Sequence, residues 1–320
     1  MSVKILGTGS AIPARSVTNN DLAQVMDTSD EWIRSRTGIG SRYIAISETS
    51  NDMAAEAGKK ALEDAGVQPE EIDMILVATI SPDQVMPNTA CEVQKRIGAH
   101  RAVCFDLNAA CSGFLFALHT ASAYLSSGFA KKILVIGVET LSKIMDWNDR
   151  STCVLFGDGA GAVVVTDGGE LPYEAVVGST GVKGEVLALD GRKNNNLYVQ
   201  NEEKNAYVTM DGQEVFKFAV STVPKITKEV LEKANVSVDE VDWFVLHQAN
   251  ERILQSVAKR LKVSLDKFPM NLERFGNTSS ASIPLLIDEM NRNNQIKEGD
   301  KLVLCGFGGG LTWGAIYLVW

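Results

Sequence analysis

Residue types that build metal or disulfide sites are scarce in this chain of 320 residues. It has five cysteines, an odd number, and none of them belongs to a Cys-x-x-Cys pair. Such usage is typical of reduced thiols in the cytoplasm rather than of a disulfide framework. The three histidines show no ligand spacing with the cysteines, so the sequence predicts no metal site.

Long apolar runs and an excess of basic charge are also lacking. No stretch of about 18 apolar residues occurs, and no charged segment followed by an apolar run opens the chain, so we expect neither a membrane span nor a signal peptide. The 31 Lys and Arg residues are outnumbered by 40 Asp and Glu residues, which disfavours a nucleic-acid partner. The hydrophobic content of 45% is ample for a large core.

What the chain does contain is an internal repeat. Residues 62–77 (LEDAGVQPEEIDMILV) resemble residues 231–246 (LEKANVSVDEVDWFVL) at an offset of 169 positions. The same offset places residues 132–137 (KILVIG) over residues 301–306 (KLVLCG). A unit of roughly 160 residues is much longer than a solenoid repeat, so the pattern indicates a duplicated half.

We place the two halves at residues 1–169 and 170–320, because Asp167-Gly-Gly-Glu170 is a turn signal between strands. Helical patterns alternate with apolar strands, which is typical of α/β sheets covered on both faces. Residues 112–127 are apolar nearly all round and are predicted to be buried between layers, whereas the polar residues 190–206 are predicted to be a surface loop. In the first half, the predicted helices are 52–65, 88–98 and 112–127, and the predicted strands are Met74–Thr79, Ala102–Leu107, Lys132–Val138 and Ala160–Thr166.

Cys111 is the candidate nucleophile. It lies in Asn108-Ala-Ala-Cys-Ser-Gly113, between a predicted strand and the buried helix. Unpaired N–H groups at a helix N-terminus favour a thiolate, so we expect a lowered pKa for this thiol, and its small neighbours allow a tight turn. A buried structural thiol is the alternative, and we assign that role to the other four cysteines, Cys91, Cys104, Cys153 and Cys305.

His247 and Asn277 are candidate partners of this thiol. His247 ends a repeat strand, at the kind of sheet edge where α/β proteins bind ligands. Asn277 is the repeat equivalent of Asn108, and both precede a run of small residues. A pseudo-two-fold relation between the halves would therefore bring the Cys111 and Asn277 turns together. A core histidine and a helix-capping asparagine are the alternatives.

Two glycine-rich segments do not fit nucleotide-binding motifs. Gly306-Phe-Gly-Gly-Gly310 lacks the Gly-Lys-Ser/Thr of a phosphate-binding loop. Residues 6–13 lack the third glycine of a dinucleotide fingerprint and have Pro13 where the helix would start. The glycines after residue 305 instead allow a backbone N–H group to approach a ligand oxygen.

Four separate motifs together resemble β-ketoacyl-acyl carrier protein synthase III, the condensing enzyme that initiates bacterial fatty-acid synthesis. They are NAACSG around Cys111, HQAN from His247, GNTSSAS around Asn277 and the terminal GFGGGLTWG, and the segments EWIRSRTGI and FGDGAGA fit as well. The likeness covers the whole chain. It implies the thiolase fold, in which two duplicated α/β halves form a five-layer αβαβα sandwich, and it implies a homodimer.

The resemblance also implies a ping-pong reaction. Cys111 takes acetyl or another short acyl group from coenzyme A, which is a substrate, so no cofactor is implied. Malonyl on acyl carrier protein then loses carbon dioxide, and its carbanion attacks the acyl-cysteine. His247 and Asn277 would donate hydrogen bonds to the malonyl thioester oxygen, and the N–H groups of Cys111 and Gly309 would form the oxyanion hole.

Binding surfaces follow from the same resemblance. The coenzyme A site would contain an adenine clamp and a pantetheine tunnel, formed by Trp32, Arg36, Thr37, Arg150, Gly212, Phe216 and Asn250. The acidic carrier protein would dock on a basic face of the helix predicted at about 250–262, formed by Arg252, Lys259 and Lys262 together with Lys217. Met86 would shape the acyl pocket, and because methionine is flexible, we expect primers longer than acetyl. Solvated helix faces are the alternative for the charged residues.

Three other activities compete with this prediction. A relative with the same fold could condense or transfer acyl groups in secondary metabolism. A cysteine hydrolase also uses Cys, His and Asn, but it needs neither the duplicated halves nor an adenine clamp. A non-catalytic acyl-binding protein would not need the full set of reactive residues.

Overall fold

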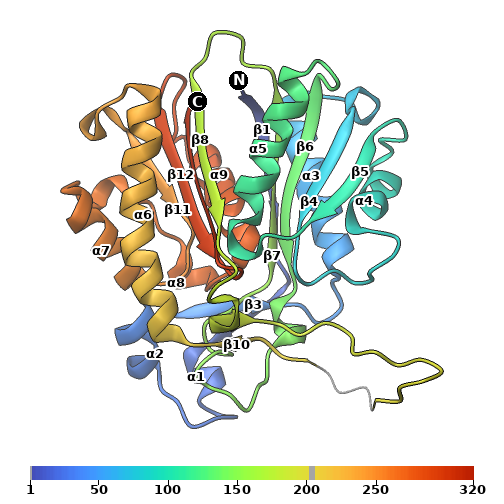
Figure 1. Cartoon of the computed structure of the whole chain (residues 1–320), viewed down its shortest axis with the longest axis vertical. Helices are drawn as coiled ribbons and strands as arrows, with labels where there is room; N and C mark the ends of the chain where they lie inside the picture. The colour runs from blue at the N-terminus through green and yellow to red at the C-terminus, as the bar shows by residue number, and fades with distance from the viewer. Residues whose placement is uncertain (1, 202–205) are drawn as a thin grey trace.

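Two large β-sheets form the framework of the chain (Figure 1). The computed structural model describes residues 2–201 and 206–320. The first sheet has the strand order β1-β7-β6-β4-β5, and the second has the order β11-β12-β13-β8. The strands of the first sheet are β1 (Lys4–Ala11), β4 (Met74–Ala78), β5 (Val103–Leu107), β6 (Lys132–Glu139) and β7 (Gly159–Thr166), and those of the second are β8 (Tyr173–Ser179), β11 (Trp243–Leu246), β12 (Lys301–Gly308) and β13 (Thr312–Val319).

The two sheets have matching topology. Strand β6 pairs parallel with β4 and antiparallel with β7, and β12 likewise pairs parallel with β11 and antiparallel with β13. Strands β1 and β8 add antiparallel to β7 and β13. Strand β5 lies at the edge of the first sheet and has no counterpart among the described strands of the second.

The offset of 169 residues also relates the elements that the repeated segments form. The first and last residues of β6 lie 169 positions before the first and last residues of β12. The same offset separates the ends of the 3₁₀ turns η2 (Ala110–Ser112) and η7 (Ser279–Ala281). The first residues of the two turns, Ala110 and Ser279, have positive φ angles of 46° and 49°. The predicted repeat is therefore present as two matching sheets, whereas the domain boundary at residue 169 stays a prediction.

Helices fill three layers, one between the sheets and one outside each of them (Figure 1). The central layer contacts strands of both sheets and contributes to a core shared by both. The outer layers each close a separate core. The central helices are α5 (Gly113–Ser126) and α9 (Ser282–Arg292), the helices on the first sheet are α3 (Ser50–Ala65) and α4 (Thr89–Ile97), and those on the second are α6 (Gly212–Ala234) and α7 (Glu251–Leu261). This arrangement is the expected αβαβα sandwich, with α5 buried between the sheets as predicted.

Local sequence signals determine where the helices begin and end. Helix α3 begins two residues before the predicted start because Thr49 caps it and forms a capping box with Asp52. It ends at Gly66, whose φ of 63° lies in the left-handed region that glycine favours. The predicted helices and strands of the first half agree with the structure to within two residues at their ends.

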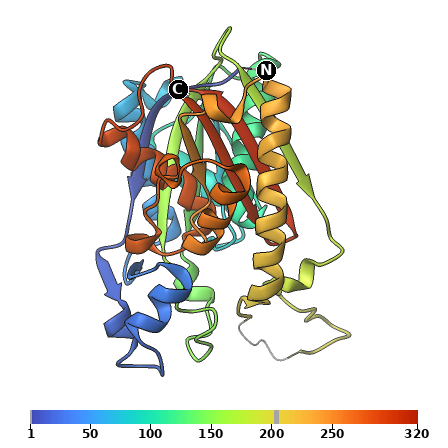
Figure 2. The same ribbon diagram turned by 90° about the vertical axis from the view of Figure 1, so that its left-hand side faces the viewer.

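A smaller group of elements lies beyond one end of the sheets (Figure 2). It contains the helices α1 (Asn19–Leu22), α2 (Asp30–Thr37) and α8 (Leu272–Phe275), and the hairpins β2 (Arg15–Thr18) with β3 (Ser41–Ile44) and β9 (Leu187–Ala188) with β10 (Thr209–Met210). Within residues 2–201 and 206–320, no helix is long and apolar enough to cross a membrane. The same residues contain no group of three His, Cys, Asp or Glu side chains arranged to hold a metal ion.

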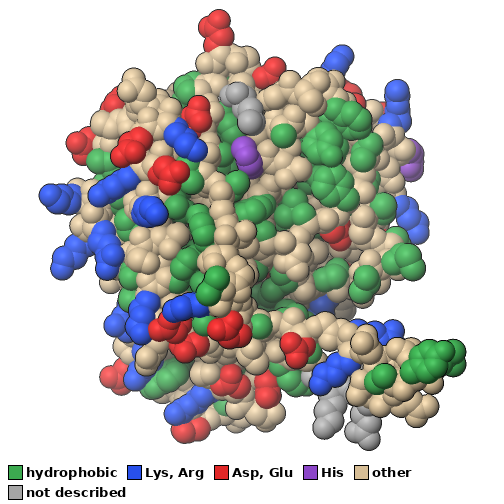
Figure 3. Space-filling model, in the orientation of Figure 1, with side chains coloured by type: hydrophobic (Ala, Val, Ile, Leu, Met, Phe, Trp, Pro, Cys, Tyr) green, Lys and Arg blue, Asp and Glu red, His purple; other side chains and the backbone are tan. Residues whose placement is uncertain are grey.

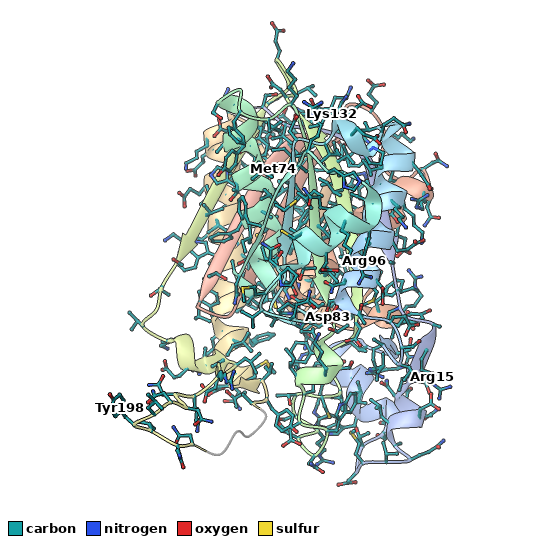
Figure 4. The ribbon with its side chains drawn as sticks, turned by 90° about the vertical axis from the view of Figure 1, so that its right-hand side faces the viewer. Arg15, Met74, Asp83, Arg96, Lys132 and Tyr198 are labelled. Carbon is teal, nitrogen blue, oxygen red and sulfur yellow. The ribbon has the colours of Figure 1, made fainter. Side chains whose placement is uncertain are left out.

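The predicted surface loop at residues 190–206 contains no helix or strand in its described part. Its tip carries Leu197 and Tyr198, whose side chains are 95% and 93% exposed. Figure 4 shows Tyr198 at the end of a segment that extends away from the sandwich. Residues 202–205 of the predicted loop lie outside the described residues.

Candidate active site

Cys111, His247 and Asn277 line one cavity of about 610 Å³. Cys111 lies in turn η2 before α5, His247 follows strand β11, and Asn277 precedes turn η7. Turns η2 and η7 pack against each other where the two sheets meet the central helices. The structure therefore brings together the three residues that the sequence singles out, across the pseudo-symmetric junction of the repeat.

Cys111 is held in a tight turn at the head of the central helix. The N–H group of Ala110 donates to the Asn108 side chain at 3.2 Å. Strand β12 approaches so closely that a Cβ atom on Gly308 would lie 2.6 Å from the Cys111 nitrogen, so only glycine fits at this position. Cys111 also lines a second cavity, so its turn lies between two spaces with different lining residues.

The expectation of a lowered Cys111 pKa is wrong for the free chain. Burial raises the pKa of the thiol to about 12, the Ser279 hydroxyl opposes this shift, and the charge of Glu139 adds to it. The motif places the cysteine at a helix N-terminus but does not reveal how completely water is excluded, and desolvation disfavours the charged thiolate. The thiol is therefore protonated near neutral pH, and its proton must leave when sulfur attacks.

His247 is a buried, neutral imidazole. Its Nδ1 atom lies 2.7 Å from the Ser282 hydroxyl, and its ring packs edge-on against Phe307 at a centroid distance of 5.5 Å. Burial lowers its pKa to about 3. A neutral imidazole carries one N–H group, and a Ser282 hydroxyl that donates to Nδ1 places that group on Nε2, where it can serve a ligand.

Asn277 is fixed by both its main chain and its side chain. Its N–H group donates to the Leu155 carbonyl at 2.9 Å, and its carbonyl accepts from Gly157 N–H at 3.0 Å. Its side-chain oxygen accepts from the N–H group of Ser279 at 2.9 Å, in the same way that Asn108 serves Ala110 in the first repeat. The side-chain oxygen of Asn277 thus has the helix-capping role that was the alternative interpretation of this residue, whereas its side-chain NH₂ group remains able to donate to a ligand.

A buried arginine supports the segment that holds Asn277. Arg42 on β3 has no exposed surface, and its guanidinium donates to the Val154 carbonyl at 2.7 Å and to the Asn19 side chain at 2.8 Å. Residues 155–157, which follow directly, form the main-chain bonds to Asn277. The position of Asn277 therefore depends on the small group of elements beyond the sheets.

The mouth of the first cavity carries an aromatic surface with cations on it. The guanidinium carbons of Arg36 and Arg150 lie 4.6 and 5.3 Å from the centre of the Trp32 ring. Arg150 also bonds Asp27 and does not line the cavity itself. The other six residues predicted to bind coenzyme A line this cavity: Trp32, Arg36, Thr37, Gly212, Phe216 and Asn250. Of these, Asn250 also caps α7 and donates to the Arg36 carbonyl at 3.0 Å.

The second cavity, of about 420 Å³, lies on the other side of Cys111. Gly309 lines it together with mainly apolar side chains, among them Ile80, Leu141, Met145, Phe156, Leu189 and Val208. In the single chain Met86 is 86% exposed and lines neither of these two cavities, so its role in the acyl pocket stays a prediction. It precedes α4 on a loop whose path the dipeptide Met-Pro does not specify.

The predicted basic face is divided between the cavity and the open surface. Arg252 and Lys217 line the mouth of the first cavity, whereas Lys259 and Lys262 are exposed farther along α7 and line no cavity that contains the predicted site residues. Figure 3 shows Lys and Arg side chains gathered over α7 and the neighbouring part of α6. Lys217 pairs with Glu214 at 2.7 Å, and Glu214 also pairs with Lys183 at 2.8 Å, so a single carboxylate only partly offsets the positive charge of the two lysines.

Sequence reasoning missed three residues that shape the site. Ser282 bonds His247, Phe156 lines both cavities, and Glu139 lies buried behind the Cys111 turn. Ser282 and Phe156 belong to motifs that had been recognised, GNTSSAS and FGDGAGA, but nothing in the spacing assigns them a partner. Glu139 is the last residue of the repeat strand β6, and a charged residue at the end of an apolar run was the sequence signal that could have identified it.

The fold and the site together define a class of protein. A thiol at the head of a central helix shares a cavity with a neutral imidazole and a carboxamide, at the junction of two matching sheets. That combination is characteristic of the thiolase-fold condensing enzymes.

Comparison with known proteins specifies the family. Family models described as 3-oxoacyl-[acyl-carrier-protein (ACP)] synthase III and its C-terminal part match residues 105–181 and 231–320. β-Ketoacyl-[acyl-carrier-protein] synthase III of Clostridium acetobutylicum is 51% identical over 100% of this chain and 99% of its own length. The crystal structure of 3-oxoacyl-[acyl-carrier-protein] synthase III from Aquifex aeolicus, 44% identical, covers 99% of this chain and 100% of its own with a TM-score of 0.92. The chain belongs to the β-ketoacyl-acyl carrier protein synthase III family.

Proposed function

We propose that the protein catalyses the decarboxylative condensation of a short acyl-coenzyme A, acetyl-coenzyme A in the first instance, with malonyl-acyl carrier protein. The product is a 3-oxoacyl-acyl carrier protein, and the step initiates fatty-acid synthesis. The observation that carries the proposal is the position of Cys111 between two cavities, one lined by Trp32 and Arg36 and a second, smaller one without charged side chains in its lining. A thioester can thus enter through the first cavity, and the acyl group that it transfers to Cys111 can occupy the second cavity.

The first half-reaction is transfer of the acyl group to Cys111. The adenine ring would stack on the Trp32 ring, and the guanidinium of Arg150, which lies 5.3 Å from the centre of that ring in the free chain, would have to move outward to cover the other face of the adenine. The pantetheine arm would then run past Asn250 and Phe216 to the sulfur. The N–H groups of Cys111 and Gly309 would hold the carbonyl oxygen as it becomes negative. The coenzyme is a substrate, and this route requires no resident cofactor.

The second half-reaction requires donors rather than a base. Decarboxylation of the malonyl group places negative charge on its thioester oxygen. His247 can donate from Nε2 because Ser282 occupies Nδ1, and Asn277 can donate from its NH₂ group because its oxygen is held by Ser279. Such preorganised donors are worth about 3 kcal/mol each in the transition state.

The carrier protein is acidic, and the basic side chains near the cavity mouth support its docking there. Arg252 is the central member of this surface, because it lines the cavity and lies on the same helix as Lys259, and Lys262 caps the C-terminal end of that helix. We further propose that the protein acts as a cytoplasmic homodimer. The odd number of unpaired cysteines supports a reducing compartment, and strand β5 offers an unpaired sheet edge to a second copy.

Mass spectrometry of the intact protein tests the first half-reaction. Acetyl-coenzyme A should add one acetyl group to the protein, and Cys111→Ala should abolish the adduct. Release of carbon dioxide from malonyl-acyl carrier protein, with formation of a 3-oxoacyl product, then separates a condensing enzyme from a hydrolase or an acyl-binding protein. An adduct that persists in Cys111→Ala would refute the assignment of the nucleophile.

The main alternative is a condensing enzyme of secondary metabolism. The priming β-ketosynthase from the R1128 polyketide biosynthetic pathway has a TM-score of 0.93 but only 37% sequence identity. The relatives with 47–51% identity are named β-ketoacyl-[acyl-carrier-protein] synthase III. This order of similarity supports the role in fatty-acid synthesis.

A further inference from the structure

A fully buried carboxyl group joins three segments that surround the second cavity. Glu139, the last residue of β6, has no exposed surface. Its side chain accepts hydrogen bonds from the loop after β4 and contacts turn η7. Within the described residues no positively charged side chain pairs with it. Lys143, in the following turn η3 (Leu141–Ile144), pairs with Asp83 at 3.2 Å instead.

One oxygen of Glu139 is fixed as an acceptor. The Oε2 atom accepts from the Ile80 N–H group at 3.1 Å, from the Ser81 hydroxyl at 2.5 Å and from the Thr79 hydroxyl at 3.3 Å. The two hydroxyl groups each accept from a main-chain N–H group, Ser81 from Thr140 at 2.9 Å and Thr79 from Ser81 at 3.1 Å, which leaves their hydrogens to donate. With three donors directed at it, Oε2 does not carry a proton of its own.

The other oxygen of Glu139 has a partner that can accept a proton. The Oε1 atom lies 2.9 Å from the Ser280 hydroxyl, which also lies 2.9 Å from the Ala78 carbonyl oxygen. If Oε1 carries a proton, it can donate that proton to the Ser280 oxygen while Ser280 donates to Ala78, and every one of these polar groups is paired. If Glu139 is ionised, the single Ser280 hydrogen must serve two acceptors, and a buried charge is left without a counter-ion.

Geometry and burial therefore both favour the neutral acid. Burial raises the pKa of the Glu139 carboxyl group, and the hydrogen bonds from its neighbours oppose this shift only in part. The negative charge of Glu139 adds to the raised pKa of the Cys111 thiol only in the alkaline range, where that thiol itself ionises. A carboxylic acid that stays protonated near neutral pH can hold its neighbours in place without a charge that would disfavour a thiolate at Cys111.

Each segment that Glu139 joins contributes a wall to the second cavity. Ile80 lies in the loop after β4, Leu141 begins η3, and Ser279 begins turn η7, and all three line the cavity. The Glu139 carboxyl group bonds the main chain of Ile80 directly and contacts Ser280, the neighbour of Ser279. It lies only two residues before Leu141. Three parts of the cavity wall are thus held at one buried point.

The joined segments also pack against the head of the central helix. A Cβ atom on Gly137 of β6 would lie 2.2 Å from the Ser280 carbonyl oxygen, so β6 and turn η7 are in direct contact. A Cβ atom on Gly113, the first residue of α5, would lie 3.0 Å from the Ala78 side chain and 3.5 Å from the Ser280 side chain. Cys111 precedes Gly113 by two residues, so the walls begin beside the sulfur that receives the acyl group.

We propose that Glu139, as a neutral carboxylic acid, positions the walls of the second cavity and thereby determines which acyl groups Cys111 accepts. The inference rests on the proposed function, which places the acyl group of the Cys111 thioester in that cavity. An acetyl group has a single carbon beyond its carbonyl carbon and stays beside the sulfur. A butyryl group extends farther, to the walls that Glu139 holds. Glu139 is a positioning residue, because it lines neither cavity itself.

The test compares the second-order rate constants with which acetyl- and butyryl-coenzyme A acylate Cys111, followed by mass, in the wild type, Glu139→Leu and Glu139→Gln. Leucine cannot form the four hydrogen bonds, so the butyryl-to-acetyl ratio should fall by about tenfold, the usual contribution of one methylene group in a hydrophobic pocket. Glutamine presents its oxygen to the three donors and its NH₂ group to Ser280, so the ratio should stay within about twofold of the wild type. A residue that is needed for its charge would not be rescued by glutamine.

Infrared difference spectra of the wild type and Glu139→Gln test the charge state directly. Near neutral pH the difference should contain the carbonyl stretch of a protonated carboxylic acid. Carboxylate bands in its place would overturn the proposal of a neutral acid.

Ser280→Ala is a milder second variant, because it removes one of the four hydrogen bonds and leaves the main chain of turn η7 in place. It should lower the butyryl-to-acetyl ratio by about two- to fivefold, at most the equivalent of one hydrogen bond. Asp288→Leu is the matched control. Asp288 is a buried carboxylate of α9 that bonds two hydroxyl groups of β1 and lines neither cavity beside Cys111, so its loss should affect both rates alike.

Several results would overturn the positioning role. They are an unchanged ratio in Glu139→Leu or in Ser280→Ala, a fall in Glu139→Gln equal to that in Glu139→Leu, and the same fall in Asp288→Leu. Strict use of acetyl-coenzyme A by the wild type would also overturn it, because no acyl carbon would then reach these walls. Failure of the wild-type chain to be acylated by either thioester would instead refute the proposed function.

Discussion

Replacement of Asn277 separates the two half-reactions. In Asn277→Ala the NH₂ donor is lost, together with the bond from the side-chain oxygen to Ser279 N–H at 2.9 Å. The main-chain bonds to Leu155 and Gly157 do not involve the side chain and remain. Acylation of Cys111, which uses neither group, should proceed within about twofold of the wild-type rate.

The magnitudes of the two losses differ enough to be distinguished. Loss of the capping bond costs about 1 kcal/mol of stability. Loss of a donor to developing charge costs about 3–4 kcal/mol, or roughly 10²–10³ in the rate of decarboxylation. A purely structural effect would therefore be too small to account for the expected loss of carbon dioxide release.

The assay follows acetylation by mass and decarboxylation of labelled malonyl-acyl carrier protein in the same preparations. Asn277→Asp is the matched control for the fold, because its carboxylate still accepts from Ser279 N–H but cannot donate. Both variants should lose decarboxylation and keep acylation. If Asn277→Ala slows both steps equally, or if Asn277→Asp decarboxylates normally, the role of Asn277 as a donor is wrong.

Three further predictions concern the carrier protein, the imidazole and the acyl group. Arg252→Glu should raise KM for malonyl-acyl carrier protein at low salt and leave acetyl transfer from coenzyme A unchanged. Lys59→Glu, the same charge change on the exposed face of α3, should change neither quantity, and equal KM values in the two variants would place docking elsewhere. Ser282→Ala removes the hydrogen bond to Nδ1 of His247 and should slow decarboxylation by about five- to tenfold, the equivalent of about 1 kcal/mol, while acylation is unchanged. An unaltered decarboxylation rate would show that the imidazole ring does not need this hydrogen bond. Butyryl- and isobutyryl-coenzyme A should acylate Cys111 as acetyl-coenzyme A does, and strict acetyl preference in the unaltered protein would contradict the use of the second cavity. Val208→Phe, which fills that cavity, should lower kcat/KM for the longer primers more than for acetyl-coenzyme A.

Local chemistry and the repeat made most of the framework predictable. Strand β6 and helix α5 follow from an apolar run and an apolar helical segment, and the offset of 169 residues led to the matching turns η2 and η7. The meeting of Cys111 with Asn277 was predictable because both occupy equivalent places in the two halves.

Features that depend on burial or loop path were not predictable. The helix N-terminus at Cys111 suggested a lowered pKa, but exclusion of water, which no motif encodes, reverses the shift. Met86 lies on a connection whose course is set by tertiary packing, and it emerges at the surface of the chain. Glu139 and Ser280, whose hydroxyl forms a hydrogen bond with the Glu139 carboxyl group at 2.9 Å, are 141 residues apart in sequence, and only the packing of β6 against turn η7 brings them together.

The central helices have a consequence for how the chain holds together. Because α5 and α9 are packed by strands of both sheets, neither half can bury its own inner helix when it is alone. A chain cut between β7 and β8 would yield one fragment with the thiol and another with the imidazole and the amide. If condensation activity returned when the two fragments were mixed, the central helical layer would have re-formed between them. The activity of the enzyme would therefore measure how well its two fragments reassemble.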